Sequence, residues 1–181
     1  MLVGKIINQN EVIMSKKKQH YQKTLVEKIL DKNNIQYQPL NFITEKQGDV
    51  EQIVPNQAPP KVKIYKTLVL TGNKTGPLVG VIPLNMHISY KMFAQLSNNK
   101  KVGMVPLKDL KKTSGFEHGA NSPIGIREQH NYPIYFDNQA LLDQEIAVSA
   151  GKIGRSVVVN AKEIAQLVDG KFGDFAINQP E

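Results

Sequence analysis

The segment 112–125 constrains the fold most, because it interrupts the periodic patterns on both sides of it. It reads KTSGFEHGANSPIG, with three glycines, one proline and four small polar residues. Such a composition matches neither the period of a helix nor that of a strand. The sequence therefore predicts a loop here, between regions that are dense in apolar residues.

The glycines of this loop are Gly115, Gly119 and Gly125. Because glycine lacks a Cβ atom, its backbone can reach positive φ and bring N–H groups close to a carbonyl or phosphate oxygen of a ligand. A long surface connection is the alternative, and the residues alone favour neither.

The composition fits one globular domain with a basic surface. The chain has 181 residues, of which 40% are apolar, and its 23 Lys and Arg against 16 Asp and Glu give a formal charge of +7. This balance favours a polyanionic partner such as nucleic acid. The lysine run at 16–18 is equally explained as a solvated tail.

Several classes of site and location are disfavoured. The chain has no cysteine, which removes disulfides and thiolate chemistry and suits a reducing cytoplasm. Its four histidines match no two-histidine metal motif, so we expect no metal and no cofactor. The first residues do not resemble a signal peptide, and no apolar run is long enough to span a membrane. We therefore expect a cytoplasmic protein without a membrane partner.

Periodicity predicts a loose N-terminal tail over residues 1–14 and one domain over 15–181. The predicted helices are one over Leu25–Leu30 that stops at Asn33, and others at 89–96, 107–112, 139–143 and 160–170. The predicted strands are 35–42, 64–70, 77–83, 101–105, 133–137, 145–149 and 155–159. The stretch 45–63 reads as a polar connection with at most a short helix at 50–53. Without a regular βαβ alternation, the elements indicate an α+β fold around a mostly antiparallel sheet.

Lys66 stands among aliphatic residues in the predicted strand 64–70. With a period of two, it shares a face with Ile64, Leu68 and Leu70. A lysine in such a row either snorkels at a sheet edge or stands at a cavity wall to meet an anion. The residues alone favour snorkelling.

Three segments together carry a resemblance to a known family: YKTLV at 65–69, the glycine loop at 113–125, and VSAGKIG at 148–154. Their order and spacing are similar to those of the YbaK/EbsC family of aminoacyl-tRNA deacylases, which includes the editing domain of bacterial prolyl-tRNA synthetases. The likeness extends from about Thr24 to Ala176. Each motif is weak alone, whereas three in register are fairly specific.

The resemblance implies a mixed, mostly antiparallel, barrel-like sheet with helices packed outside. It implies trans-editing, the hydrolysis of the ester between a wrong amino acid and the terminal ribose of tRNA, most often cysteine on proline tRNA. The enzyme class would be hydrolase, with lyase as a second classification. The expected partners are a mischarged tRNA and prolyl-tRNA synthetase.

By the same resemblance, Lys66 and Gly119 are the catalytic residues. Lys66 would help to place the charged 3′ end of the tRNA, and the backbone of Gly119 would lie beside the substrate carbonyl. The thiol or the ribose hydroxyl of the substrate would assist the attack. The predicted substrate-binding residues are Ser114, Gly115, Ser149, Gly151 and Lys152.

Three positions depart from the family pattern. Ala120 stands where a second glycine is common, Phe42 where the better-known member has tyrosine, and Ser156 where that member has aspartate. These changes leave the amino-acid specificity open, so another small amino acid such as alanine is an alternative. A non-catalytic module of the same fold that binds tRNA or a synthetase is a second alternative.

Other residues also allow two interpretations. His118 is either a general base or a packing or surface residue, and the second is favoured because no partner can be named. Lys152 and Arg155 either meet tRNA phosphates or form exposed salt bridges. Ser149 either contacts substrate or forms a hydrogen bond at the end of a strand.

Overall fold

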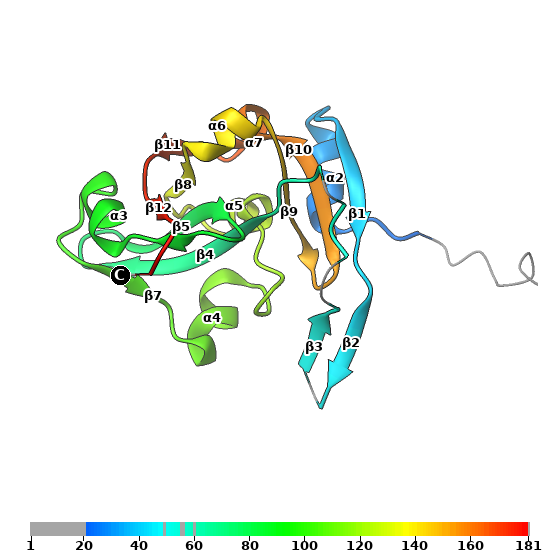
Figure 1. The fold of residues 1–181 in the computed structure, drawn as a ribbon, viewed down its shortest axis with the longest axis horizontal. Coiled ribbons are helices and arrows are strands. Elements are labelled where there is room, and N and C mark those ends of the chain that lie inside the picture. Colours follow the sequence, from blue (N-terminus) through cyan, green and yellow to red (C-terminus); the bar gives the residue numbers. More distant parts are fainter. Residues whose placement is uncertain (1–20, 49, 55–56, 60, 181) are drawn as a thin grey trace, which may run out of the picture.

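The computed structural model describes residues 21–180, except 49, 55–56 and 60. The predicted tail at 1–14 and the lysine run at 16–18 lie outside the described residues. The helices are α2 (Leu25–Lys32), α3 (Tyr90–Leu96), α4 (Leu107–Ser114), α5 (Pro123–Gln129), α6 (Gln139–Asp143) and α7 (Ala161–Leu167). Figure 1 shows how they surround two sheets.

The larger sheet has five strands in the order β11-β8-β5-β4-β7. Its strands are β4 (Tyr65–Gly72), β5 (Gly76–Pro83), β7 (Val102–Met104), β8 (Ile134–Asp137) and β11 (Lys171–Gly173). The β4–β5 and β4–β7 pairs are antiparallel, whereas β5–β8 and β8–β11 are parallel. The predicted hairpin of two strands around residues 71–76 is therefore confirmed.

The second sheet is antiparallel, in the order β1-β10-β9. It comprises β1 (Tyr37–Asn41), β9 (Glu145–Lys152) and β10 (Arg155–Asn160), and it lies on the right of Figure 1 with α2 beside it. An isolated parallel bridge between Ile64 and Ala147 joins the two sheets at one end of β4. Away from this bridge the sheets diverge.

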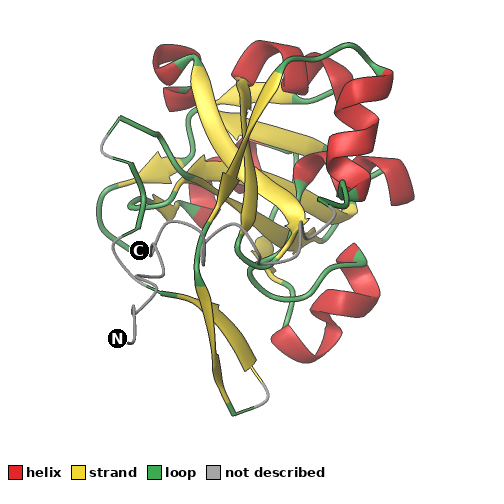
Figure 2. Cartoon of the chain, turned by 90° about the vertical axis from the view of Figure 1, so that its right-hand side faces the viewer, coloured by secondary structure: helices red, strands yellow, loops and turns green. Residues whose placement is uncertain are grey.

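Two further pairs of strands are separate. One joins β6 (His87–Ile88) to β12 (Ala176–Ile177), and the other joins β2 (Thr44–Gln47) to β3 (Val50–Ile53). The β2–β3 hairpin projects from the body of the molecule (Figure 2). The prediction of a polar connection with a short helix at 50–53 is therefore wrong. Gly48, at a φ of 66°, turns the chain so that the flanking residues can pair.

The coarser fold prediction is confirmed, since helices and mostly antiparallel strands are mixed without a βαβ repeat. The barrel-like sheet is not confirmed, because the strands of the described residues form separate sheets of five, three, two and two strands.

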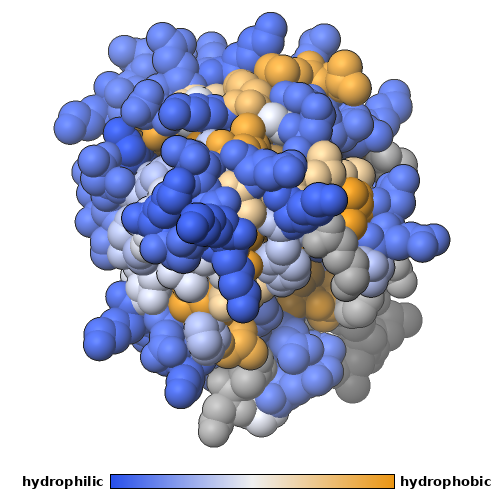
Figure 3. Space-filling view, turned by 90° about the vertical axis from the view of Figure 1, so that its left-hand side faces the viewer, coloured by the Kyte–Doolittle hydropathy of each residue, from blue (hydrophilic) through white to orange (hydrophobic). Residues whose placement is uncertain are grey.

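The apolar core has two parts. One cluster joins residues of both sheets to α2, α5 and α7, with Val26, Val79, Ile124, Phe136 and Val148 among its fully buried members. The other lies between the five-stranded sheet and α3 and is centred on Phe93, which packs against Tyr135 and Phe175. On the face shown in Figure 3, hydrophilic side chains cover most of the surface and apolar side chains appear in separate patches.

The glycine loop and a second loop, at 150–154 between the strands predicted at 145–149 and 155–159, are both shorter than expected. Helix α4 continues to Ser114, and α5 already begins at Pro123, because Ser122 caps it by accepting a hydrogen bond from the N–H of Gly125. Only residues 115–122 are irregular. Strand β9 extends to Lys152, so the second loop is reduced to a tight turn at Ile153 and Gly154.

Candidate active site

A cavity of about 660 Å³ lies where the two sheets diverge. Its wall is mainly apolar and is formed by β4, α4, the glycine loop, the β9–β10 hairpin and the segment after β3. The lining residues are Phe42, Ile53, Val54, Gln57, Ala58, Ile64, Tyr65, Lys66, Thr67, Leu68, Val69, Leu84, Met104, Val105, Leu107, Leu110, His118, Gly119, Asn121, Ser149 and Ser156. None of these described lining residues is acidic.

The structure brings Lys66, Gly119 and Ser149 to this one cavity, although they lie on separate segments of the chain. Lys66 is half-buried, and within the described residues it has no ion pair and no hydrogen bond. Burial lowers the pKa of Lys66 below its ordinary value. The cavity therefore holds a cation that no described anion neutralises.

The cavity lies along a free edge of β4. The N–H of Leu84 donates to the carbonyl of Ile64, so the peptide groups of the even-numbered residues of β4 face β5. Those of the odd-numbered residues face the opposite side, where the N–H of Val105 donates to the carbonyl of Val69. Strand β7 pairs with β4 only from Leu70 onward, and β9 bridges it only at Ile64. Between these points the peptide groups of Thr67 face the cavity side, where none of the described strands pairs with them.

Gly119 forms part of the wall through its backbone. Its φ is 84°, a region that residues with a side chain rarely adopt, and a Cβ atom placed there would have no atom within 4 Å. The N–H of the next residue, Ala120, is held by the carbonyl of Glu117. A ligand can therefore approach the peptide of Gly119 closely from the cavity.

Ser149 and Ser156 face each other across the β9–β10 pair, and both line the cavity. The hydroxyl of Ser149 accepts a hydrogen bond of 3.1 Å from the N–H of Gly151. Ser149 thus forms the local hydrogen bond that was one interpretation of this residue, and it also lies at the cavity wall.

The other predicted substrate-binding residues lie outside this cavity. Ser114 is fully buried, and its hydroxyl accepts a hydrogen bond from the N–H of Phe116. Gly115, Gly151 and Lys152 line a second, smaller cavity of about 340 Å³. Gly151 is in contact with Phe116, since a Cβ atom there would lie 2.9 Å from the ring.

Arg155 forms a buried ion pair. Its guanidinium lies 2.8 Å from the carboxylate of Glu27, which is 1% exposed, and stacks on the ring of Tyr21. Burial alone would raise the pKa of Glu27, but hydrogen bonds from Tyr21 and the N–H of Thr24, together with the charge of Arg155, lower it. Arg155 therefore forms a salt bridge, as one interpretation expected, but the pair is buried and not exposed.

His118 and Lys152 are both exposed, and neither has an ion pair within the described residues. His118 lines the cavity, yet no hydrogen bond within the described part of the chain orients its ring. A histidine that acts as a general base is usually held by such a partner.

Two residues at the cavity wall were not singled out from the sequence as site residues. Thr67 Oγ1 and Asn121 Oδ1 are buried side-chain oxygens that lack a hydrogen-bond partner among the described residues. Both residues line the cavity. No sequence motif identifies Thr67 or Asn121 as a site residue, although they lie near Lys66 and Gly119 in the chain. The absence of a hydrogen-bond partner can be seen only in the folded structure.

Within residues 21–180, outside the four undescribed positions, no group of three or more His, Asp or Glu residues could hold a metal ion. In the same part of the chain, no helix has the length and apolarity needed to cross a membrane.

Comparison with known proteins identifies the family. A family model described as the aminoacyl-tRNA editing domain matches residues 44–167, which is more than half of the chain. A curated protein of Enterococcus faecalis, named "Putative Cys-tRNA(Pro)/Cys-tRNA(Cys) deacylase EbsC", is 37% identical over 164 residues that cover 90% of this chain and 99% of that protein. The chain belongs to the family of aminoacyl-tRNA editing domains.

Solved structures share the fold. One is described as "a putative trans-editing enzyme for prolyl tRNA synthetase"; it has a TM-score of 0.57 and 20% identity, and the match covers 63% of this chain and 70% of that one. Another, the hypothetical protein APE2540, has a TM-score of 0.67 and 15% identity, with 84% and 99% of the two chains covered. At these identities the likeness shows the fold alone.

Proposed function

We infer that this protein is a trans-editing aminoacyl-tRNA deacylase that hydrolyses Cys-tRNA(Pro) in the cavity beside β4. The family membership and the name of the relative from Enterococcus faecalis support this activity and this substrate. We assign the activity to one editing domain over residues 15–181, acting in the cytoplasm and without a cofactor.

The observation that carries the proposal is the joint presence of Lys66 and Gly119 at one apolar cavity that has no acidic residue in its described wall. An unpaired ammonium group in an environment of low dielectric attracts ribose and ester oxygens more strongly than it would in water. Peptide N–H groups around Gly119 can donate to the ester oxygen as negative charge develops on it. The two residues then act on the same substrate group from different segments.

The proposed mechanism uses groups of the substrate. The chain has no cysteine, and the described cavity wall has no carboxylate, so the wall offers neither a thiolate nucleophile nor an acidic general base. The cysteine thiol or the ribose hydroxyl of the substrate therefore assists the attack on the ester carbonyl. The roles of Ser149 at the main cavity, and of Ser114, Gly115, Gly151 and Lys152 outside it, stay predictions.

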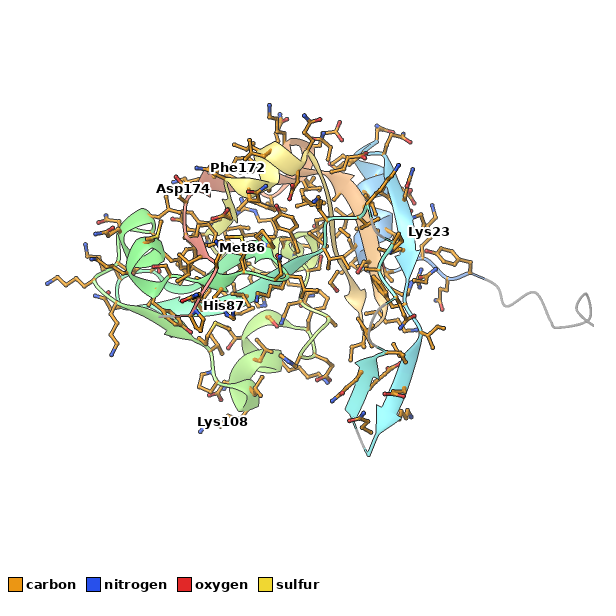
Figure 4. The ribbon with its side chains drawn as sticks, viewed as in Figure 1. Lys23, Met86, His87, Lys108, Phe172 and Asp174 are labelled. Carbon is orange, nitrogen blue, oxygen red and sulfur yellow. The ribbon has the colours of Figure 1, made fainter. Side chains whose placement is uncertain are left out.

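Helix α4 supplies a basic surface next to the cavity. Leu107 and Leu110 line the cavity, while Lys108 and Lys112 of the same helix are exposed and unpaired within the described residues. Lys111 is also exposed but forms an ion pair with Glu117. Figure 4 shows Lys108 directed away from the body of the molecule. Exposed lysines at the rim of a site suit the phosphates of a tRNA acceptor end, which contact cations without sequence preference. Prolyl-tRNA synthetase is a further proposed partner.

A deacylation assay with Cys-tRNA(Pro), Ala-tRNA(Pro) and Pro-tRNA(Pro) tests the proposal. We expect rapid hydrolysis of the cysteinyl ester, slow hydrolysis of the other two, and loss of most activity in the Lys66→Ala variant. Hydrolysis of the alanyl ester alone would favour the alternative substrate. Tight tRNA binding without hydrolysis of any ester would favour the non-catalytic alternative.

A further inference from the structure

Two unsatisfied oxygens lie at the same cavity. Among the described residues, Thr67 Oγ1 and Asn121 Oδ1 are the buried side-chain polar atoms that lack a partner, and both residues belong to the cavity wall. Buried polar groups are nearly always hydrogen-bonded, because an unmade bond leaves the cost of desolvation uncompensated. Their occurrence at one cavity indicates a subsite whose ligand completes these bonds.

The backbone of Thr67 points to the same conclusion. Its N–H and carbonyl face the free edge of β4, between the bridge at Ile64 and the start of the pairing with β7 at Leu70. Because the cavity runs along this edge, residues from both faces of β4 reach its wall, including Lys66 and Thr67. Thr67 thus offers its hydroxyl and its carbonyl as acceptors.

The side chain of Asn121 neither caps a helix nor closes a turn in its loop. The neighbouring Ser122 caps α5 through its hydroxyl, and the N–H of Ala120 closes the preceding turn. Asn121 as a whole residue is only 8% exposed, and its side chain has no hydrogen bond in the described part of the chain. Neither capping nor turn formation explains why a carboxamide is buried here.

The ligand chemistry follows from the charges of the wall. The ammonium group of Lys66 can donate hydrogen bonds only to oxygen atoms of a ligand. A ligand group that itself carries several N–H donors needs acceptors, and the described wall offers no carboxylate as an acceptor. An aminoacyl ester carries one such group, its α-ammonium, next to the ester carbonyl. We propose that Thr67 and Asn121 form the subsite that binds the α-ammonium group of the aminoacyl ester. This inference rests on the proposed function and adds the residues that hold the amino acid.

The subsite orients the substrate through charge. With the α-ammonium group between Thr67 and Asn121, the ester oxygens lie toward Lys66 and Gly119, because a cation is repelled from Lys66. Reversed binding would place two cations together in an apolar cavity. Thr67 and Asn121 are therefore substrate-binding residues that select esters with an α-amino group.

The test compares Cys-tRNA(Pro) with 3-mercaptopropionyl-tRNA(Pro), which keeps the thiol and lacks the α-amino group. For the wild type, we expect kcat/KM to be roughly 10- to 100-fold higher for the cysteinyl ester, the range for a hydrogen bond to a charged group. In Asn121→Leu and Thr67→Val, kcat/KM for the cysteinyl ester should fall, while that for the des-amino ester should change less than threefold. Equal losses with both esters, or no loss with either, would overturn the proposal.

A matched control separates this role from a structural one. Asn99 is also 8% exposed, but it lies away from the cavity and accepts a hydrogen bond of 2.9 Å from the N–H of Lys74. Asn99→Leu should lower the melting temperature and leave the preference between the two esters unchanged. Asn121→Leu should not lower the melting temperature, because it removes an unsatisfied oxygen.

Binding of nonhydrolysable analogues gives a readout that is independent of turnover. The probes are 3′-cysteinylamino-3′-deoxyadenosine and its analogue without the α-amino group, measured by calorimetry. The wild type should bind the first more tightly, and Asn121→Leu should discriminate between the two analogues less strongly, because only Thr67 of the subsite remains. A wild type that hydrolyses neither ester but still discriminates between the analogues would refute the proposed function and keep the subsite. Equal binding of both analogues by the wild type would refute the subsite.

Discussion

Replacing Gly119 by alanine separates backbone strain from obstruction of the cavity. A methyl group at Gly119 would meet no atom within 4 Å, so the substitution creates no clash, but the φ of 84° makes it strained. An L-residue in this region costs about 1 kcal/mol, which for a chain of this size lowers the melting temperature by roughly 2–4 °C. The methyl group stands in the cavity, where the ester approaches the peptide N–H groups. Because the methyl group keeps the ester away from one such donor, kcat of Gly119→Ala should fall by roughly 100-fold, the effect of losing one donor.

The matched control is Gly76, at the turn between β4 and β5. Its φ is 68° and a Cβ atom there would also have no neighbour within 4 Å, but it does not line the cavity. Gly76→Ala should show the same small drop in melting temperature and deacylate Cys-tRNA(Pro) within about twofold of the wild type. The reasoning fails if both variants keep wild-type activity, or if both lose it to the same extent.

Three further results are expected. The Lys66→Met variant should lose most deacylation activity, yet at pH 7 it should unfold at a higher urea concentration than the wild type. Burial lowers the pKa of Lys66, so the charged lysine destabilises the fold at pH 7. The difference in stability between variant and wild type should therefore shrink as the pH rises toward about 10.4, the pKa of lysine in an unfolded chain. Glu27→Gln should reduce the free energy of unfolding by about 3 kcal/mol, since it leaves Arg155 unpaired, and urea titrations should show this difference narrowing as the pH falls below about 4. Lys108 and Lys112 of α4 are exposed and have no ion pair within the described residues, whereas Lys111 is paired with Glu117. If these two lysines contact two phosphates, tRNA affinity should fall roughly 12-fold between 50 and 200 mM salt in filter-binding assays, and unchanged affinity would exclude these contacts.

The elements with a buried face were the ones that periodicity could predict. Strand β5 is buried without interruption from Leu78 to Pro83, and β4 and α3 also bury apolar residues, such as Leu70 and Phe93. The helix predicted at 160–170 begins where the side chain of Asn160 accepts hydrogen bonds from the N–H groups of Lys162 and Glu163. In these segments local preference and tertiary packing agree.

The β2–β3 hairpin and α5 were missed for physical reasons. The described side chains of the hairpin are mostly exposed, so no apolar alternation records the pairing. Helix α5 spans only two turns and contains Pro123 and Gly125, which suggest a loop when read without the cap at Ser122. Short elements held by caps and neighbours leave a weak periodic signal.

The candidate site was predictable where motifs mark it and not where contacts define it. Lys66 and Gly119 could be chosen through the family pattern, and both lie at the main cavity. Arg155 could not be assigned, because its partner Glu27 is 128 positions away along the chain. Thr67 and Asn121 could not be singled out either, since what distinguishes them is the lack of a partner in the folded chain.

The position of the cavity follows from how β7 ends. Continuing the register of β7 would place Leu107 opposite Thr67, where its peptide groups would close the edge of β4. Instead the chain leaves the sheet at Pro106, at φ −56° and ψ 144°, and Leu107 begins α4. A helical residue directs its peptide groups along the helix axis and cannot complete a strand pair. The edge of β4 therefore stays open beside Lys66, and its unpaired groups, costly in a buried sheet, become available to a ligand. A substitution that let the chain continue as a strand beyond Val105 would give the peptide groups of Thr67 hydrogen-bond partners and fill the cavity. Such a variant should gain free energy of unfolding and lose the site.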